Sequence, residues 1–506
     1  VPTWWWTVAG QPGEMSAHEI TVPATIPNVI GGREMLPAAG EVLDKLSPLT
    51  GAPLWQVARS RVADVENAVA AAKGAQAGWA AVTPVRRGEI LHAVVTELQA
   101  NRERIARLVA QETGKSYPNA LGETDGAIAL GRFMAGEGQR LYGRTTTSGT
   151  ANKWAMTIRQ PIGVAGLVIA ANTPIANVAW KVFPALICGN TAVLKAAEDT
   201  PATAWLFAAL AARAGLPDGV LNVINGMGLE AGAPLVAHSD VAVVSFTGST
   251  AVGREIASVV GRRMGRVSLE LGGKNPMVVC DDADLENAAR WVILSAFSNA
   301  GQRCASGSRV IVFDRIYDEF KSKLLQEVAK LRVGGGDDDD FGPVINERQL
   351  NNILGAINKA RDTGATVLCG GERLSGPGYD GGFFIAPTLV ENVGFEDEIS
   401  RTELFGPVAS LYRVSGFSDA LTLANESPYG LTACIHTRDI NRALEFVNRV
   451  EAGVAVVNAG TFGSEPHMPF GGVKQSGNGS REPGTEALDV YSSLKNVYIS
   501  VDPTRL

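Results

Sequence analysis

The stretch GVAGLVIAANTPIANVAWKVFPALICGNTAVLKAAEDTPATAWLFAALAARAG, residues 163–215, decides the fold, because apolar runs of strand length alternate along it with helical patterns. The series comprises strands predicted at 162–170, 190–197, 220–226 and 241–248 and helices predicted at 176–189 and 200–215. We expect the first helix to stop at Gly189, and Thr200, followed by Pro201, to cap the second. The alternation predicts a parallel, doubly wound sheet with right-handed crossovers.

A second alternating series runs from residue 275 to residue 458, and Gly272 and Gly273 separate it from the first. Before both series, residues 62–108 show helical periodicity that is interrupted at Pro84. A chain of 506 residues is too long for one small domain and suggests two or three. The sequence therefore predicts two α/β units with a helical segment ahead of them.

The composition, 45% hydrophobic and 19% charged residues, is typical of a soluble globular protein. The net charge of −7 argues against a nucleic-acid or acidic-membrane partner, and no apolar run reaches the roughly 18 residues that span a bilayer. The first residues lack the pattern of an export signal, and we expect residues 1–27 to form a mobile arm. Five cysteines and five histidines lie scattered without metal-ligand spacing, which predicts a reducing, cytoplasmic location and no metal.

Candidate cofactor residues follow two of the predicted strands, although the chain has no GxGxxG motif. Phe246 ends one strand, and Gly248 and Ser249 then open a helix whose N-terminus could hold a pyrophosphate. Lys195 ends another strand with Glu198 three residues on, so that both could face a ribose. A carboxylate there favours NAD over NADP. An ordinary strand-to-helix turn and a surface ion pair are the competing interpretations.

Three residues suggest nucleophilic chemistry. Cys304 lies in SNAGQRCASGS (298–308) among small residues and beside Arg303, whose charge could stabilise a thiolate, whereas the other cysteines lie in apolar contexts typical of a core. Glu270 ends an apolar strand, so it is expected to be either paired or functional with a raised pKa. Asn172 follows a buried strand and could donate to an oxyanion or simply form a turn.

Together these stretches resemble the aldehyde dehydrogenase superfamily from about residue 28 to residue 500. The matching stretches occur in the family's order: AANTPIAN, GNTAVLKAAEDTPATA, SFTGSTAVGREI, LELGGKNP, NAGQRC, ELFGPV, NESPYGL and PFGGVKQSGNGSREPGTEAL. The interval from Glu270 to Cys304, 304 − 270 = 34 residues, is also that of the family. The resemblance implies a Rossmann-like cofactor domain, a second α/β catalytic domain and a small β extension for oligomerisation.

The resemblance also implies roles for individual residues. Cys304 would be the nucleophile and Glu270 the general base, and Asn172 with the Cys304 N–H would form the oxyanion hole. Lys181 matches a lysine of the helix after the asparagine, and Glu482 a structural partner behind the site. For NAD, or alternatively NADP, the implied residues are Lys195, Glu198, Phe246, Gly248, Ser249, Glu403 and Phe405.

The substrate is expected to be an aldehyde, and the resemblance places Arg303, Thr173, Phe462, His467 and Phe470 in the tunnel that leads to it. We expect Arg303 to bind a carboxylate, so that the substrate is a semialdehyde acid; a structural ion pair of Arg303 is the alternative. Neutral aliphatic or aromatic aldehydes remain alternative substrates. A CoA-acylating enzyme, a cysteine hydrolase without cofactor and a non-catalytic binding protein on the same scaffold are the less favoured functions.

The resemblance divides the chain into segments. Residues 1–143 and 163–272 would form the NAD-binding domain and residues 273–473 the catalytic domain. Residues 144–162 and 485–506 would form oligomerisation segments that join subunits into a homodimer or homotetramer. Two departures from the family lie at the tunnel and the adenosine site. Ala170 and Ala171 replace a common Pro-Trp, which predicts a wider or more polar tunnel, and Ala196 replaces the usual proline after the cofactor lysine.

Overall fold

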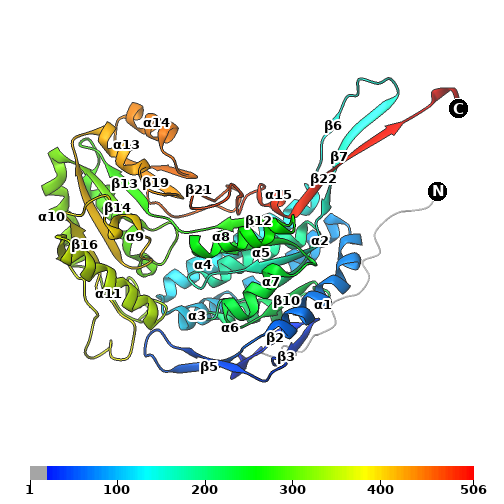
Figure 1. The fold of residues 1–506 in the computed structure, drawn as a ribbon, viewed down its shortest axis with the longest axis horizontal. Helices are drawn as coiled ribbons and strands as arrows, with labels where there is room; N and C mark the ends of the chain where they lie inside the picture. Colours follow the sequence, from blue (N-terminus) through cyan, green and yellow to red (C-terminus); the bar gives the residue numbers. More distant parts are fainter. Residues whose placement is uncertain (1–19, 506) are drawn as a thin grey trace.

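The computed structural model describes residues 20–505 and contains two seven-stranded sheets with helices packed on them, together with three small sheets (Figure 1). Most of the predicted mobile arm, residues 1–19, lies outside the described residues, whereas Thr25–Ile26 forms a strand, β1, that pairs with β5 (Pro53–Ala58). Within residues 20–505, no helix is both long and apolar enough to cross a bilayer. The α/β fold class predicted from the sequence is confirmed.

The first large sheet has the order β12-β11-β8-β9-β10-β2-β3. Its five parallel strands are β8 (Val164–Val168), β9 (Thr191–Lys195), β10 (Leu221–Ile224), β11 (Val241–Thr247) and β12 (Arg266–Glu270). Two antiparallel strands, β2 (Asn28–Ile30) and β3 (Arg33–Met35), complete one edge. β8 and β9 are buried throughout, which explains why they read as continuous apolar runs rather than alternating ones.

Helices cover both faces of this sheet. The helices that follow its parallel strands include α5 (Pro174–Ile187), α6 (Pro201–Arg213) and α8 (Thr250–Arg262). The periodic segment before the sheet forms α1 (Val62–Ala81), α2 (Pro84–Ala100), α3 (Arg102–Thr113) and α4 (Tyr117–Gly136). Pro84 is the first residue of α2, so the predicted interruption is a helix start.

The N-terminus of α6 departs from the expectation for Thr200. Thr200 is the residue before the helix, but its hydroxyl makes no capping bond and has no hydrogen-bond partner among the described residues. Instead, the buried carboxylate of Glu112, at the end of α3, accepts hydrogen bonds from the N–H groups of Ala202 (2.7 Å) and Thr203 (2.9 Å). A tertiary contact therefore replaces the local cap that the sequence predicts.

The second large sheet has the order β15-β16-β17-β14-β13-β19-β20 and belongs to the chain after residue 274 (Figure 1). Its strands are β13 (Asn275–Val279), β14 (Gly307–Phe313), β15 (Thr366–Cys369), β16 (Thr388–Glu391), β17 (Val408–Val414), β19 (Thr432–His436) and β20 (Val454–Val457). All neighbours pair in parallel except β15 and β16. Its helices include α9 (Leu285–Phe297), α10 (Tyr317–Val328), α11 (Glu347–Asp362), α13 (Phe417–Asn425) and α14 (Ile440–Arg449).

A three-stranded antiparallel sheet projects from the body, with its far end close to the C-terminus (Figure 1). It consists of β6 (Thr145–Thr146), β7 (Lys153–Pro161) and β22 (Ser492–Ser500), and β7 and β22 pair along nine residues. Large apolar side chains are exposed on it, namely Trp154, Ile158, Leu494, Tyr498 and Ile499.

Candidate active site

Two cavities meet between the large sheets, and four residues line both of them: Asn172, Thr247, Glu270 and Cys304. The first cavity, about 530 Å³, extends past the N-terminus of α8 toward α11 and residues 402–405. The second, about 430 Å³, extends between α4, α5 and residues 462–470. The three residues predicted to do the chemistry therefore lie where a ligand in one cavity could reach a ligand in the other.

The first sheet brings three of these residues together, because β8, β11 and β12 are neighbouring parallel strands. Thr247 and Glu270 end β11 and β12 and are paired in register, and Asn172 lies in the turn after β8. Carboxyl ends of parallel strands meet at one sheet edge, which is where ligands bind in open α/β sheets. The second sheet supplies Cys304 from the loop before β14.

This nucleophile loop, residues 298–306, has a strained backbone. Asn299, Ala300 and Gly301 have φ angles of 55°, 54° and 66°, in the left-handed region. A Cβ on Gly301 would lie 2.1 Å from the carbonyl oxygen of Gly406, so only glycine fits there. The Cys304 carbonyl accepts a hydrogen bond from Asn275 Nδ2 at 2.7 Å. The small residues around the cysteine thus allow a tight loop that presents the thiol to both cavities.

The thiol of Cys304 is held in its protonated form by its surroundings. Burial, followed by the carboxylates of Glu403 and Glu270, raises the pKa of Cys304 to about 12, because a thiolate there would be desolvated and near negative charge. The predicted help from Arg303 is not among the leading influences on this pKa. Instead, the Arg303 guanidinium donates to Ser298 Oγ and lies 4.6 Å from the ring centroid of Phe462.

Glu270 is a buried carboxyl group without a hydrogen-bond partner for either oxygen among residues 20–505. Burial, followed by repulsion from Glu482, raises the pKa of Glu270 well above its ordinary value. Lys181 does not contact it directly, since its ammonium pairs with Glu482 at 3.0 Å and donates to Ser245 Oγ at 2.6 Å, with both charged side chains fully buried. An unpaired carboxyl group with a raised pKa beside a thiol is suited to general acid–base chemistry.

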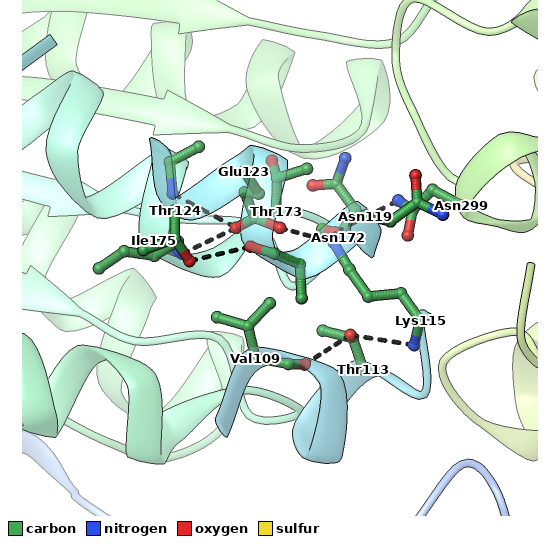
Figure 2. A network of polar contacts seen from close by, with 12 residues as sticks. Val109, Thr113, Lys115, Asn119, Glu123, Thr124, Asn172, Thr173, Ile175 and Asn299 are labelled. Carbon is green, nitrogen blue, oxygen red and sulfur yellow. Dashed lines mark hydrogen bonds and ion pairs between the residues drawn. The ribbon is translucent and has the colours of Figure 1, made fainter. Parts of the chain in front are cut away.

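Asn172 is oriented by contacts on both its side chain and its main chain. Its Nδ2 donates to the carbonyl of Gln302 at 3.0 Å, which leaves the second proton of the amide free to donate. Its own carbonyl accepts from Lys115 Nζ at 2.7 Å and from Asn299 Nδ2 at 3.4 Å (Figure 2). The amide is therefore attached to the nucleophile loop itself.

The first cavity is lined by four of the residues predicted to bind the cofactor. Gly248 and Ser249 line it at the N-terminus of α8, where Ser249 Oγ caps the helix by accepting from Val252 N at 3.4 Å. Glu403 and Phe405 line its other side, and a Cβ on Gly272 would lie 2.0 Å from Glu403 Oε2, so glycine keeps the space beside the carboxylate open. Burial raises the pKa of Glu403 to about 7.

The remaining predicted cofactor residues, Lys195, Glu198 and Phe246, are not among the residues that line this cavity. Lys195 Nζ and Glu198 Oε2 form an ion pair of 3.1 Å at the end of β9. Burial raises the pKa of Glu198, but the Lys195 ammonium and a hydrogen bond outweigh this and leave it below its ordinary value, so Glu198 is an anionic acceptor. The ring of Phe246 packs against Gly248, where an added Cβ would lie 2.4 Å from it.

Four of the five predicted tunnel residues, Arg303, Thr173, Phe462 and Phe470, line the second cavity. His467 does not line it; its side chain is 56% exposed and lies 3.5 Å from Glu465. A histidine in a loop between two aromatic tunnel residues can point outward, and no sequence pattern distinguishes the two orientations.

Sequence reasoning missed further residues that line the cavities. They are Thr247 at the meeting point, Gln349 in the first cavity, and Lys115 and Glu123 in the second. Gln349 Nε2 donates to the carbonyl of Leu404 at 2.6 Å and so supports the segment that carries Glu403. Thr247 could have been found as the residue directly after Phe246 at a strand end. The other three are ordinary polar residues of helices or helix starts, for which the sequence offers no signal.

The comparisons with known proteins agree with this geometry. The profile of the aldehyde dehydrogenase family matches residues 36–497. The α-ketoglutaric semialdehyde dehydrogenase of Bacillus subtilis (strain 168) is 39% identical over 483 residues, which cover 95% of this chain and 99% of the relative. Among solved structures, betaine aldehyde dehydrogenase from Staphylococcus aureus in complex with NAD+ has a TM-score of 0.92 at 31% identity, covering 94% of this chain and 95% of that one. An NADP-dependent enzyme of E. coli has a TM-score of 0.91 at 36% identity, covering 94% and 98%.

The family match spans the second large sheet, the five parallel strands of the first and most of the projecting sheet, and the relatives are matched over nearly their whole length. The chain belongs to the aldehyde dehydrogenase family and is an oxidoreductase that acts on the aldehyde group.

Proposed function

We propose that the enzyme oxidises a carboxylate-bearing semialdehyde to the corresponding dicarboxylic acid with NAD. The observation that carries the proposal is the position of Arg303. Its side chain lines the substrate-side cavity next to the nucleophile, and it forms no ion pair of 4.0 Å or less with any carboxylate among residues 20–505. The semialdehyde dehydrogenase of B. subtilis, at 39% identity, supports the same substrate class.

The charges that line the second cavity favour an anionic substrate. Lys115 and Glu123 neutralise each other in a 2.6 Å ion pair, and Glu270 carries less negative charge than an ordinary carboxylate because burial raises its pKa. Arg303 is then the one cation without a matching anion among the cavity residues. Burial lowers the pKa of Arg303 to about 10, so it stays charged at neutral pH and would gain a charge-assisted bond from a substrate carboxylate.

The proposed reaction uses three of the four residues at the meeting point, namely Cys304, Asn172 and Glu270. Cys304 loses its proton to solvent and adds through Sγ to the aldehyde carbon, while the Asn172 amide and the Cys304 backbone N–H donate to the developing oxyanion. Glu403, Phe405, Ser249 and the Lys195–Glu198 pair would hold NAD, which would supply the hydride acceptor needed for the adduct on Cys304 to become a thioester. Glu270 then takes a proton from water, the hydroxide attacks the thioester carbon, and the carboxylic acid leaves as Cys304 is regenerated.

The test is the Arg303→Gln variant, assayed with an ω-oxo carboxylic acid and with the neutral alkanal of the same chain length. A charge-assisted hydrogen bond contributes about 1.5–3 kcal/mol, so we expect KM for the acid to rise about 10- to 150-fold and KM for the neutral aldehyde to change little. Equal losses for both substrates would contradict the proposed substrate class and favour neutral aldehydes. Accumulation of an acyl-CoA instead of the free acid would identify the acylating alternative, which Glu270 argues against.

The preference for NAD rests on Glu198. Its carboxylate can accept hydrogen bonds from ribose hydroxyls and would repel a 2′-phosphate, whereas the adjacent Lys195 could attract one. We expect kcat/KM to be higher with NAD than with NADP, and Glu198→Gln to reduce the difference. An unchanged ratio in that variant would remove Glu198 from the choice of cofactor.

We further propose the division of the chain expected from the sequence, with residues 1–143 and 163–272 binding the cofactor, residues 273–473 carrying the nucleophile, and residues 144–162 and 485–506 joining subunits. The exposed apolar side chains on β7 and β22 support the last assignment, because such a surface is rarely left open to water. We expect a homodimer or homotetramer. Elution at the monomer mass of 53.1 kDa would contradict it. The five unpaired cysteines support a reducing compartment such as the cytoplasm.

A further inference from the structure

A buried ion pair lies directly behind the amide of Asn172. Lys115, in the turn before α4, and Glu123, one and a half turns into that helix, pair at 2.6 Å, and their side chains are 3% and 5% exposed (Figure 2). A buried ion pair is weak evidence for stability, since desolvation opposes its Coulomb attraction. The buried Lys115–Glu123 pair is therefore better explained by a role in positioning the groups around it than by a contribution to stability.

Each member of the pair contacts the segment between β8 and α5. Lys115 Nζ donates to the carbonyl of Asn172 at 2.7 Å, and Glu123 Oε1 accepts from the N–H groups of Ile175 at 3.0 Å and Ala176 at 3.4 Å. Thr173, the residue before α5, makes no side-chain cap, so Glu123 serves as the cap of α5 from another helix. The pair thus fixes the segment that carries Asn172 at two points.

The nucleophile loop depends on the same carbonyl. Asn299 Nδ2 donates both to the carbonyl of Asn172, at 3.4 Å, and to that of Gln302, at 3.1 Å, and Asn172 Nδ2 donates to Gln302 O. Asn299 lies in the left-handed stretch just before Cys304, with φ 55°. A shift of the Asn172 main chain would therefore move both the donor to the oxyanion and the loop that presents the thiol.

We propose that Lys115 and Glu123 are positioning residues that hold the Asn172 amide at the angle required to donate to the oxyanion. The inference rests on the proposed role of Asn172 in the reaction. Neither residue needs to touch the substrate, because all the hydrogen-bonding capacity shown for the pair is directed at each other and at the main chain of Asn172, Ile175 and Ala176.

The chain contains a matched control. Glu112 caps α6 in the same way that Glu123 caps α5: both are buried glutamates from a preceding helix, and both accept from two N–H groups behind a Thr-Pro helix start. Glu112, however, lies away from the two cavities. If capping alone mattered, Glu112→Gln and Glu123→Gln would have the same effects. We expect only Glu123→Gln to lower kcat, with both variants losing thermal stability.

The decisive experiment is a double-mutant cycle between Lys115→Met and Asn172→Ala, measured as kcat with a carboxylate aldehyde and with a neutral aldehyde. Loss of an oxyanion donor costs about 10²–10³-fold in kcat. We expect Lys115→Met alone to lower kcat at least ~10-fold for both aldehydes with little change in KM, and to cost less than ~3-fold in the Asn172→Ala background. Lys115→Arg, which restores a cation, is expected to recover most of the activity.

The outcomes separate this inference from the proposed function. If the fold losses in kcat of Lys115→Met and Asn172→Ala multiply in the double variant, the two residues act independently. That result would overturn the positioning role while leaving Asn172 as the oxyanion donor. A loss confined to KM for the carboxylate aldehyde would overturn it too, since it would make Lys115 a substrate-binding residue. Full activity of Asn172→Ala would instead refute the proposed oxyanion hole. If Lys115→Met does not fold, the same cycle is run with Glu123→Gln, whose amide oxygen still accepts from α5.

Discussion

Because the His436 side chain is buried, its contribution to the pH dependence of the free energy of unfolding can be calculated. It lies on β19 with 1% exposure, and neither ring nitrogen has a hydrogen-bond partner among residues 20–505. Burial lowers its pKa from 6.5 to about 4, so the folded protein holds the ring neutral where the unfolded chain would protonate it. Because the folded pKa is depressed, stability is complete above pH 6.5 and is lost as the pH falls toward 4.

The expected loss follows from linkage. With pKa values of 6.5 unfolded and about 4 folded, the free energy of unfolding falls by about 2 kcal/mol between pH 8 and pH 5, and by about 3.4 kcal/mol below pH 4. Substituting leucine, which is of similar size and does not titrate, removes this contribution. The stability of His436→Leu relative to the parent enzyme should therefore rise by about 2 kcal/mol from pH 8 to pH 5.

The assay is urea unfolding of both proteins at pH 8 and pH 5, followed by circular dichroism, because the difference of differences cancels every other titrating group. His467→Gln is the control for replacing a histidine whose side chain is exposed. A constant stability difference between His436→Leu and the parent at the two pH values would refute the reasoning, for it would mean that the buried ring is protonated in the folded protein or already neutral in the unfolded chain.

Four further predictions concern the site and the helices of the first unit. Glu403→Gln removes the largest electrostatic influence on Cys304, so alkylation of the thiol should begin at lower pH than in the parent enzyme; an unchanged profile would leave burial alone to explain the raised pKa. Glu270→Gln should keep a pre-steady-state burst of NADH while steady turnover falls about 10²–10⁴-fold, whereas a lost burst would place Glu270 before thioester formation. Gly131→Val should lower the free energy of unfolding by at least ~1–3 kcal/mol, since even a Cβ would lie 2.7 Å from the aromatic ring behind it. Gly74→Ala, which meets nothing within 4 Å, should instead stabilise by about 0.5–1 kcal/mol in thermal unfolding.

The sequence predicted the α/β architecture because its decisive strands are buried on both faces. β8 and β9 contain only buried residues, so they read as short apolar runs between helical segments. Asn172, Glu270 and Cys304 were predictable for a different reason, since each is out of place in its local context: a carboxylate ending an apolar strand, an amide after a buried one, and a cysteine among glycines and polar residues.

What the sequence did not predict depends on contacts between distant segments. Thr200 has the local sequence pattern of a helix cap. In the structure, however, Glu112, about ninety residues earlier in the chain, accepts the hydrogen bonds from the first N–H groups of α6. Nothing in the local sequence distinguishes Glu123 and Lys115 from other charged residues. Their hydrogen-bond partners lie 52 to 57 residues later in the chain, in the turn after β8 and the first turn of α5, and come into reach only when α4 packs on α5. The same limit applies to His467, whose direction is set by a loop with no periodic pattern.

The meeting of the two cavities at Cys304 bears on how covalent ligands would behave. Any group attached to Sγ stands where the cavity beside α8 meets the cavity beside α4 and α5. A small adduct would leave the larger cavity accessible, while a bulky one would reach into it and compete with the dinucleotide. The size of an electrophile, rather than its affinity, would thus decide whether inactivation of Cys304 spares cofactor binding. A reagent long enough to enter both cavities from Sγ would probe both of them through one covalent bond.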